Sequence, residues 1–430
     1  MTPTGHDPKH LVRLTQAQLD DAVRLHALFR ESRGGHRAVL IGCDLSGLDL
    51  TGCDMSHADF TGSSFFGANL CGARFDSATL FACDFREANM ANVSMSRADL
   101  RGGFFAGANM VSANLFEADL RPGAHVTRDA AGNFQVLAPQ DRPGAAASGG
   151  FIGANLTDAT LAGAIAVKTD FSEAIMRGCK LVRAHVRSAN FTGSNLQGAD
   201  FAQADTRDAC FRGAVIAGAT FEYANMAGAD LQNALTDKPN GRLLDELHAG
   251  LPELLSLHRR FIESCGAAGA ALDLSGFDLR GAGVLADACL TMFTARKTVF
   301  YGLDLSRAAL QAARCPEADF RDCRFDGADL RGIALPGALL NGASMKGAKL
   351  CSLVLGSGRL MASDLSGASL RHVDLRGADL RGVTLAGADL SFADLTGADL
   401  ANVDLAGAVL AACKVSPEQI ATALRGDRAA

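Results

Sequence analysis

Two histidines in similar sequence contexts are the first residues that could do chemistry. His26 lies in the segment LHALFRES, and His258 lies in the segment LHRRFIES. A histidine can act as a general base or bind a metal ion. Neither has a second histidine, a cysteine or a carboxylate at helical ligand spacing. We therefore interpret each as a half-buried side chain that anchors a helix to the first coil of the fold.

Sequence signatures of catalysis and cofactor binding are absent. The chain contains no G-x-S-x-G, no H-E-x-x-H, no P-loop and no dinucleotide fingerprint beside a strand. The hexapeptide period of acyltransferase solenoids and the nonapeptide of calcium-binding β-rolls are also absent. We expect a protein that is not an enzyme and that holds no metal and no cofactor.

Four aspartates form a second candidate group. They recur every five residues within residues 382–412, a stretch that contains no lysine or arginine. Regularly spaced carboxylates can form an acidic interaction surface. The candidate interaction residues are Asp389, Asp394, Asp399 and Asp404.

The element that carries these side chains is a five-residue repeat. From Leu40 to Leu120 every fifth residue is Leu, Met or Phe. The period resumes one residue out of phase over 151–231, and it resumes again over 300–410, where only Cys315 departs from it. A helix repeats every 3.6 residues and a strand every 2. A period of five requires a chain that turns a corner after each repeat, which is a solenoid.

Each repeat has an inward and an outward part. Around the central Leu395, the small Ala393 also points inward, Asp394 points outward, and Gly397 suits the corner. A longer period of 20 residues predicts four repeats per coil, with coils about 4.8 Å apart. That longer period is visible in Phe151, Phe171, Phe191 and Phe211.

These repeats resemble the pentapeptide-repeat family, whose members fold as right-handed quadrilateral β-helices. The resemblance covers residues 38–121, 151–232 and 273–412. It implies an all-β solenoid. Some members of this family imitate duplex DNA in shape and charge and act on type II topoisomerases. A fold alone does not specify a function.

The distribution of charge along the chain bears on two possible functions, a protein-interaction scaffold and a DNA mimic. The four aspartates approach the density of duplex DNA, about one charge per 1.7 Å. Elsewhere the charges are mixed, with 12 acids and 14 bases over 273–381, as on an ordinary solvated surface. The arginines between 280 and 331 interleave with acidic residues, and we interpret them as self-neutralising surface pairs. We therefore expect a non-catalytic protein-interaction scaffold with an unidentified macromolecular partner. The alternative is a DNA mimic that binds a type II topoisomerase. No direct nucleic acid binding is expected, and a homodimer that joins two C-terminal ends would double the acidic length.

The cysteines help to predict the cellular compartment of the protein. The chain has 12 cysteines and no C-x-x-C pair, and its N-terminus lacks the apolar core of a secretory signal. No run of about 18 apolar residues is present. We expect a reduced, cytoplasmic protein without a membrane span. Six cysteines occupy the small inward position and are expected to be buried free thiols: Cys43, Cys53, Cys83, Cys179, Cys323 and Cys413.

Helices are expected to cap the solenoid ends. The pair Thr15 and Gln18 predicts a helix start and a helix to about residue 31, with Leu19, Val23 and Phe29 near one face. Two further helices are predicted over 243–250 and 252–266, with Pro252 near the start of the second. A last helix is predicted from Ser416-Pro-Glu-Gln419 to about residue 424.

Two breaks in the repeat define the organisation. Residues 121–150 predict a hairpin with its turn at 131–133. The ladder of Phe65, Phe85 and Phe105 would continue at position 125, and if the break is an insertion, Phe151 takes that slot and the solenoid is continuous. Residues 236–265 interrupt the repeat and resemble the N-terminal helical segment. We expect a tandem duplication of two helix-capped solenoids, residues 1–235 and 236–430, the second with a C-terminal cap helix.

Overall fold

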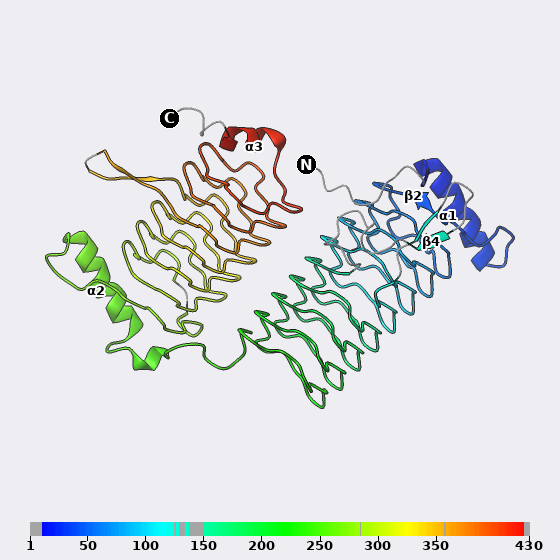
Figure 1. Cartoon of the computed structure of the whole chain (residues 1–430), viewed down its shortest axis with the longest axis horizontal. Coiled ribbons are helices and arrows are strands. Elements are labelled where there is room, and N and C mark those ends of the chain that lie inside the picture. Colours follow the sequence, from blue (N-terminus) through cyan, green and yellow to red (C-terminus); the bar gives the residue numbers. More distant parts are fainter. Residues whose placement is uncertain are drawn as a thin grey trace. The chain divides into compact units, whose positions relative to one another are not determined.

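The computed structural model describes residues 11–123, 126–128, 134–136, 150–283, 285–356 and 358–424. The repeats form short parallel bridges rather than long strands. The residue before each central residue pairs with a residue twenty positions away, as in Asn69 with Asn89 and Asp374 with Asp394. Twenty residues are four repeats, so each coil has four sides, and residues twenty apart stack in columns (Figure 1). The chain is a β-helical solenoid, as its period predicts.

Two side chains of each repeat fill the interior. Leu395 and Ala393 are both buried, and the rings of Phe65, Phe85 and Phe105 stack with centroids 4.9 and 5.0 Å apart. Burial of one such large side chain contributes roughly 1.5–3 kcal/mol before chain entropy is subtracted. The two residues after the central one turn the corner, and the second adopts a left-handed backbone that suits glycine.

The chain divides into two compact units, Met1–Asp237 and Lys238–Ala430. Each unit has its own apolar core of buried side chains. The border lies two residues after the one predicted from the sequence. That the two units are independent domains stays a prediction.

Unit 1 begins with β1 (Val12–Arg13) and α1 (Gln16–Arg30), and β1 pairs in parallel with β2 (Cys43–Asp44) of the first coil. The predicted capping box of Thr15 and Gln18 is confirmed. Leu19 is buried, but Phe29 is 45% exposed, so its predicted place on the buried face was wrong. His26 takes that place, and the Phe29 ring stacks against it with centroids 6.2 Å apart.

The interruption of unit 1 contains β3 (Val126–Arg128) and β4 (Phe134–Val136), which pair antiparallel. The predicted hairpin is confirmed, while its predicted turn at 131–133 lies outside the described residues. Across the interruption Phe104 pairs with Gly150, and the rings of Phe105 and Phe151 stack at 4.3 Å. The predicted continuous solenoid, with Phe151 in the slot of position 125, is therefore confirmed.

Unit 2 begins with η3, a 3-10 helix (Leu244–Glu246), and α2 (Leu251–Glu263), and it ends with α3 (Pro417–Leu424). The helix predicted over 243–250 was wrong beyond one turn, because Leu247 and Gly250 have extended backbones with ψ of 142° and 141°, which end the 3-10 helix and start α2. Pro252 lies in the first turn of α2, as predicted. The predicted capping box of α3 is confirmed by reciprocal hydrogen bonds between Ser416 and Gln419.

The structure corrects the prediction that repeats run unbroken from 300 to 410. At Lys349 the bridge partner is Asp379, thirty residues on instead of twenty. The ten extra residues leave the coil as a hairpin of β5 (Leu353–Val354) and β6 (Leu360–Met361), orange in Figure 1. Leu360 is 64% exposed although the five-residue period makes it a central residue. Unit 2 therefore has half a coil less than its sequence predicts.

Candidate functional site

The two histidines make the same pair of hydrogen bonds in the two units. Nε2 of His26 lies 3.0 Å from the Ser56 carbonyl oxygen, and the Ala38 N–H donates to Nδ1 at 3.1 Å. His258 makes the corresponding contacts at 3.0 and 3.1 Å, with the carbonyl oxygen of residue 291 and the N–H of residue 272. Since Nδ1 accepts, each ring is neutral and carries its proton on Nε2.

This geometry makes the histidines structural. Both rings are fully buried, rather than half-buried as predicted, and burial lowers the pKa of each. Both ring nitrogens are occupied by backbone groups, so neither histidine can accept a proton from a substrate or bind a metal in this arrangement. The predicted anchoring role of His26 and His258 is confirmed.

The structure does not bring the four predicted aspartates together on one face. Residues five apart lie on successive sides of a coil, so four consecutive repeats place their outward side chains on four different sides. Each aspartate accordingly has its own column. The bridge partners are Ser369 for Asp389, Asp374 for Asp394, Asp379 for Asp399 and Thr384 for Asp404.

Bases from neighbouring coils reach three of these aspartates. The shortest distances are 2.6 Å from Arg371 to Asp389, 3.6 Å from Arg381 to Asp399, and 4.0 Å from Lys414 to Asp394. Burial alone would raise the pKa of Asp389, but hydrogen bonds from Ser391 and the nearby Arg371 lower it overall. A stretch without bases in the sequence therefore has bases around it in space. Its role as an interaction site stays a prediction.

One group of outward arginines is neutralised by an aspartate of the same repeat. In the pair Asp379 and Arg381, Nε donates to Oδ1 and Nη2 donates to Oδ2, both at 2.8 Å. Arg381 lowers the pKa of Asp379 to about 2. Nine arginines of the described chain bind the aspartate two residues before them: Arg86, Arg101, Arg121, Arg207, Arg280, Arg321, Arg331, Arg376 and Arg381. Within the predicted stretch 280–331, the self-neutralising pairs of Arg280, Arg321 and Arg331 are confirmed, although the Arg321 pair is buried and not on the surface.

In the described part of the chain, neither the cysteines nor the helices form a reactive centre. All twelve cysteines are free thiols, and burial raises the pKa of Cys83, Cys179 and Cys323 in the interior. Cys53 and Cys413 are only partly buried, because they lie in end coils. Within the described ranges, no three His, Cys, Asp or Glu side chains are placed to hold a metal ion. In the same ranges, no helix has the length and apolarity to cross a membrane.

The coils, their period and their fourfold sides match a family model. The model described as pentapeptide repeats (8 copies) matches residues 36–121, 154–233, 304–352 and 363–416, which is more than half of the chain. This chain belongs to the pentapeptide-repeat family. The right-handed β-helix of pentapeptide-repeat proteins is therefore the fold of its coils. The gap between the last two matches coincides with the β5–β6 hairpin.

Solved structures of other proteins match this chain at low sequence identity. QnrB1, described as a plasmid-mediated fluoroquinolone resistance protein, is 22% identical, and the match covers 47% of this chain and 90% of QnrB1 with a TM-score of 0.29. HetL of the cyanobacterium Nostoc sp. strain PCC 7120, a protein involved in heterocyst differentiation regulation, is 19% identical, with coverages of 90% and 97% and a TM-score of 0.21. No curated protein matches the chain.

Proposed function

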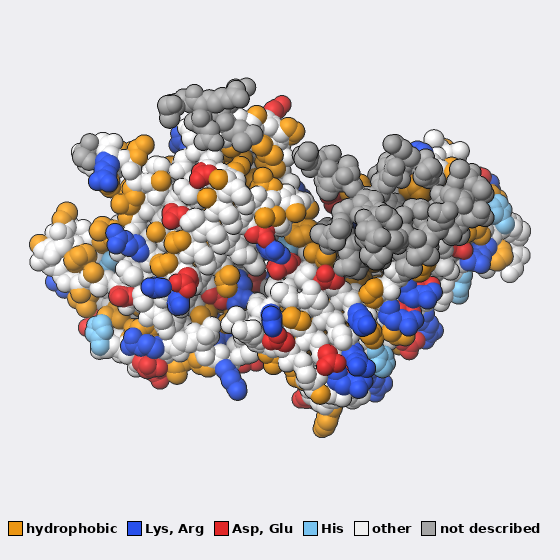
Figure 2. All heavy atoms as spheres, in the orientation of Figure 1, with side chains coloured by type: hydrophobic (Ala, Val, Ile, Leu, Met, Phe, Trp, Pro, Cys, Tyr) orange, Lys and Arg blue, Asp and Glu red, His pale blue; other side chains and the backbone are white. Residues whose placement is uncertain are grey.

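We propose that this protein is a non-catalytic scaffold that presents the flat sides of its β-helix to a protein partner. The observation that supports this is the filled interior, in which the central side chains stack in continuous buried columns. A close-packed interior leaves no room for a substrate, so a ligand must bind on the outer surface. Figure 2 shows acidic and basic side chains interspersed over that surface. Flat sides held in register suit a macromolecule better than a small ligand, which needs a concave site.

Capture from an extract of the native host tests this proposal. Tagged full-length protein is expected to retain a specific protein that mass spectrometry identifies. Phe191→Asp is the matched control, because a carboxylate in the aromatic column disrupts the coils and should abolish capture. Failure to retain any protein over the control, or turnover of a small substrate by the purified chain, would overturn the scaffold proposal.

The DNA-mimic alternative has a separate test in gyrase supercoiling. We expect little or no inhibition at micromolar protein, because Asp389, Asp394, Asp399 and Asp404 lie on four sides and three of them have basic neighbours. Any inhibition should weaken with added salt, since exposed charges are screened. Strong inhibition that salt does not weaken would favour the DNA mimic.

We also infer that α1, α2 and α3 cap two tandem units, residues 1–235 and 236–430. Open solenoid ends are unpaired edges that need cover. The histidine anchors support capping at the start of each unit, and the Gln419 side chain supports it at the end, because it donates to the carbonyls of Leu395 and Ala398. A fragment from Pro239 to Ala430 should then be soluble, with a β-type circular dichroism spectrum. Aggregation of this fragment would argue for one fused solenoid.

The proposal also includes a cellular location and an oligomeric state. The protein is assigned to the cytoplasm, because its twelve thiols are free and the cytoplasm keeps thiols reduced. A homodimer through the C-terminal ends is proposed because two-fold dimers are the commonest closed assembly. Fractionation of the host tests the first assignment, and sedimentation velocity across a concentration series tests the second.

A further inference from the structure

One coil of unit 1 lacks the aspartates that neutralise arginines elsewhere. Residues 174–199 contain no aspartate or glutamate. Five side chains between 177 and 187 are exposed, and we call this stretch the basic coil. Its members are Arg177, Lys180, Arg183, His185 and Arg187.

In the basic coil other residues occupy the aspartate positions. Arg177 and Arg187 follow central residues, where an arginine elsewhere binds the aspartate two residues earlier. The residues two positions earlier here are Ile175 and His185. Lys180 itself occupies the aspartate position of the repeat between them. Three consecutive repeats therefore lack the aspartate that could neutralise a basic side chain of the same repeat.

The second source of counter-ions is also missing for Arg177. Where an arginine lacks an aspartate in its own repeat, it can bind an acid eighteen residues later, as Arg212 binds Asp230 and Arg371 binds Asp389. Eighteen residues after Arg177 the chain has an asparagine, residue 195. An amide carries no charge, so the next coil does not neutralise this arginine.

The resulting cations are open to a partner. Within the described part of the chain, neither Arg177 nor Lys180 has an acidic oxygen within 4.0 Å, and Nε of Arg183 donates to the neutral Gln203 side chain at 3.0 Å. Arg187 lies 3.5 Å from Asp208. The pattern differs from the nine neutralised arginines, each of which binds both oxygens of a carboxylate.

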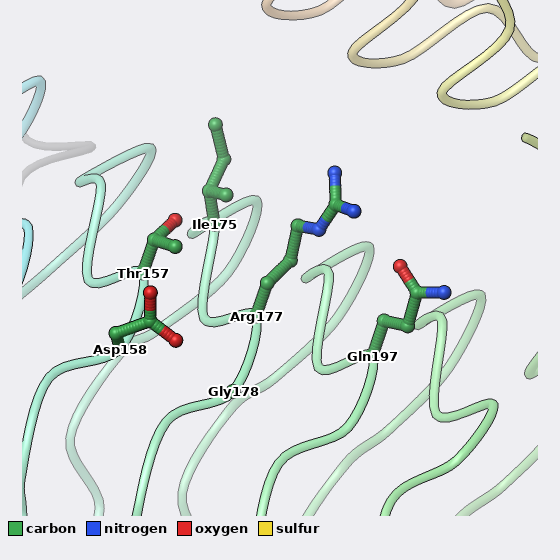
Figure 3. Close-up of a pocket in the computed structure, with 6 residues that line it drawn as sticks. All are labelled: Thr157, Asp158, Ile175, Arg177, Gly178 and Gln197. Atoms are coloured by element: carbon green, nitrogen blue, oxygen red, sulfur yellow. The ribbon is translucent and has the colours of Figure 1, made fainter.

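Three of these cations span one side of the β-helix. That side begins at the corner that carries Arg177, has Lys180 at its middle and ends at the corner that carries Arg183. Figure 3 shows Arg177 extending outward from its coil between Ile175 and Gln197, over a shallow hollow. The hollow is lined by Thr157, Asp158, Ile175, Arg177, Gly178 and Gln197.

We propose that this side of unit 1, from Arg177 through Lys180 to Arg183, binds an acidic segment of a partner protein. The proposal rests on the scaffold function and names the chemistry of the partner. Charge complementarity supports an acidic partner segment. The neighbouring coils bear carboxylates on this side, Asp158 before and Asp200 after, so the cationic band is one coil wide. A short acidic segment across the band avoids these carboxylates, whereas the extended phosphates of a nucleic acid would face them.

Fluorescence anisotropy of labelled hexaglutamate with the full-length protein tests the proposal. We expect saturable binding at low salt that weakens with added salt. The triple variant Arg177→Gln, Lys180→Gln, Arg183→Gln should weaken binding about tenfold, since three exposed ion pairs are lost. The control variant Arg101→Gln, Arg121→Gln, Arg207→Gln changes the net charge equally but removes arginines that are already paired. It should stay within about twofold of the parent chain, with both variants unchanged in circular dichroism.

Two results of the binding assay would contradict the proposed binding surface. An equal loss in both triple variants would show that only net charge matters. Tighter binding of a single-stranded oligonucleotide than of hexaglutamate would assign the band to nucleic acid. In host extract, the first triple variant should retain less of the captured partner. If partner capture persists in the triple variant, this surface is wrong while the scaffold stands, whereas absence of capture by the parent chain removes the scaffold itself.

Discussion

The two interruptions of the solenoid differ in how their lengths relate to five. In unit 1 Phe104 pairs with Gly150, where an unbroken twenty-residue period would place position 124. That interruption is one residue longer than a whole number of repeats, so the period resumes out of phase at Phe151. The interruption of unit 2 adds two whole repeats, and the period continues through Leu355 and Leu360 although both have left the coil. The period thus reports which side chains can point inward, and it does not report which repeats belong to the coil.

The largest effect is expected from deletions in unit 1 that change the phase. Removal of 123–148 should join the column of Phe105 to Phe151 and leave the unit folded. Removal of 123–146 or of 123–150 shifts every later side chain out of its inward slot, so the coils after Leu120 should unfold. Thermal melting by circular dichroism measures this. Equal stability of the three deletions would contradict the register that the bridges define.

The matching deletion in unit 2 sharpens the comparison. Removal of 351–360 should rejoin Leu350 to the coil that follows and cost little beyond the hairpin's own contacts. The main loss is the packing of Leu353 beside Gly332. Removal of 351–358 or of 351–362 should unfold the coils after the hairpin, because the inward slots no longer align. Comparable melting of the 351–358 and 351–360 deletions would show that the hairpin belongs to the coil.

A pair of substitutions tests whether the β5–β6 hairpin lies outside the coil. Leu350 and Leu360 hold equivalent positions in the five-residue period, yet Leu350 is fully buried and Leu360 is 64% exposed. Leu350→Asp buries an unpaired carboxylate and should cost several kcal/mol, on the order of 3–5. Leu360→Asp should change the free energy of unfolding by less than about 0.5 kcal/mol. Denaturant unfolding measures both, and equal losses would place Leu360 back in the core.

The smallest effect is expected from the feature that the two units share. Burial lowers the pKa of His26 and His258 in the folded state, so each ring is neutral there. The unfolded chain, with a histidine pKa of about 6.5, binds the proton first as the pH falls. The stability from these anchors is therefore complete above about pH 6.5 and declines below it.

Melting temperatures between neutral pH and pH 5 test the anchors separately. His26→Gln and His258→Gln should each lower the melting temperature at neutral pH and flatten part of its decline in acid. The two should differ in detail, because Arg30, Arg37 and Asp54 act on the pKa of His26. An unchanged acid decline in the double variant would show that other groups control it.

The sequence alone determined the local geometry of this protein. A period of five fixes which two side chains of each repeat enter the core and where the chain turns, because both depend on residues within one repeat. For the same reason the capping boxes at Thr15 and Ser416 and the duplicated histidines could be predicted. The predicted position of Phe29 failed, because at 3.6 residues per turn Phe29 points about 80° away from Leu19, whereas His26 points within about 20° of it.

Only the tertiary structure decided which repeats are neighbours. Contacts between coils join residues twenty apart, so they depend on how many repeats lie between two points. The β5–β6 hairpin changes that number without leaving a mark on the period. The same reasoning explains the aspartates from Asp389 to Asp404, which are consecutive in the repeat, lie on four sides of a coil, and meet bases such as Arg371 that come from another coil.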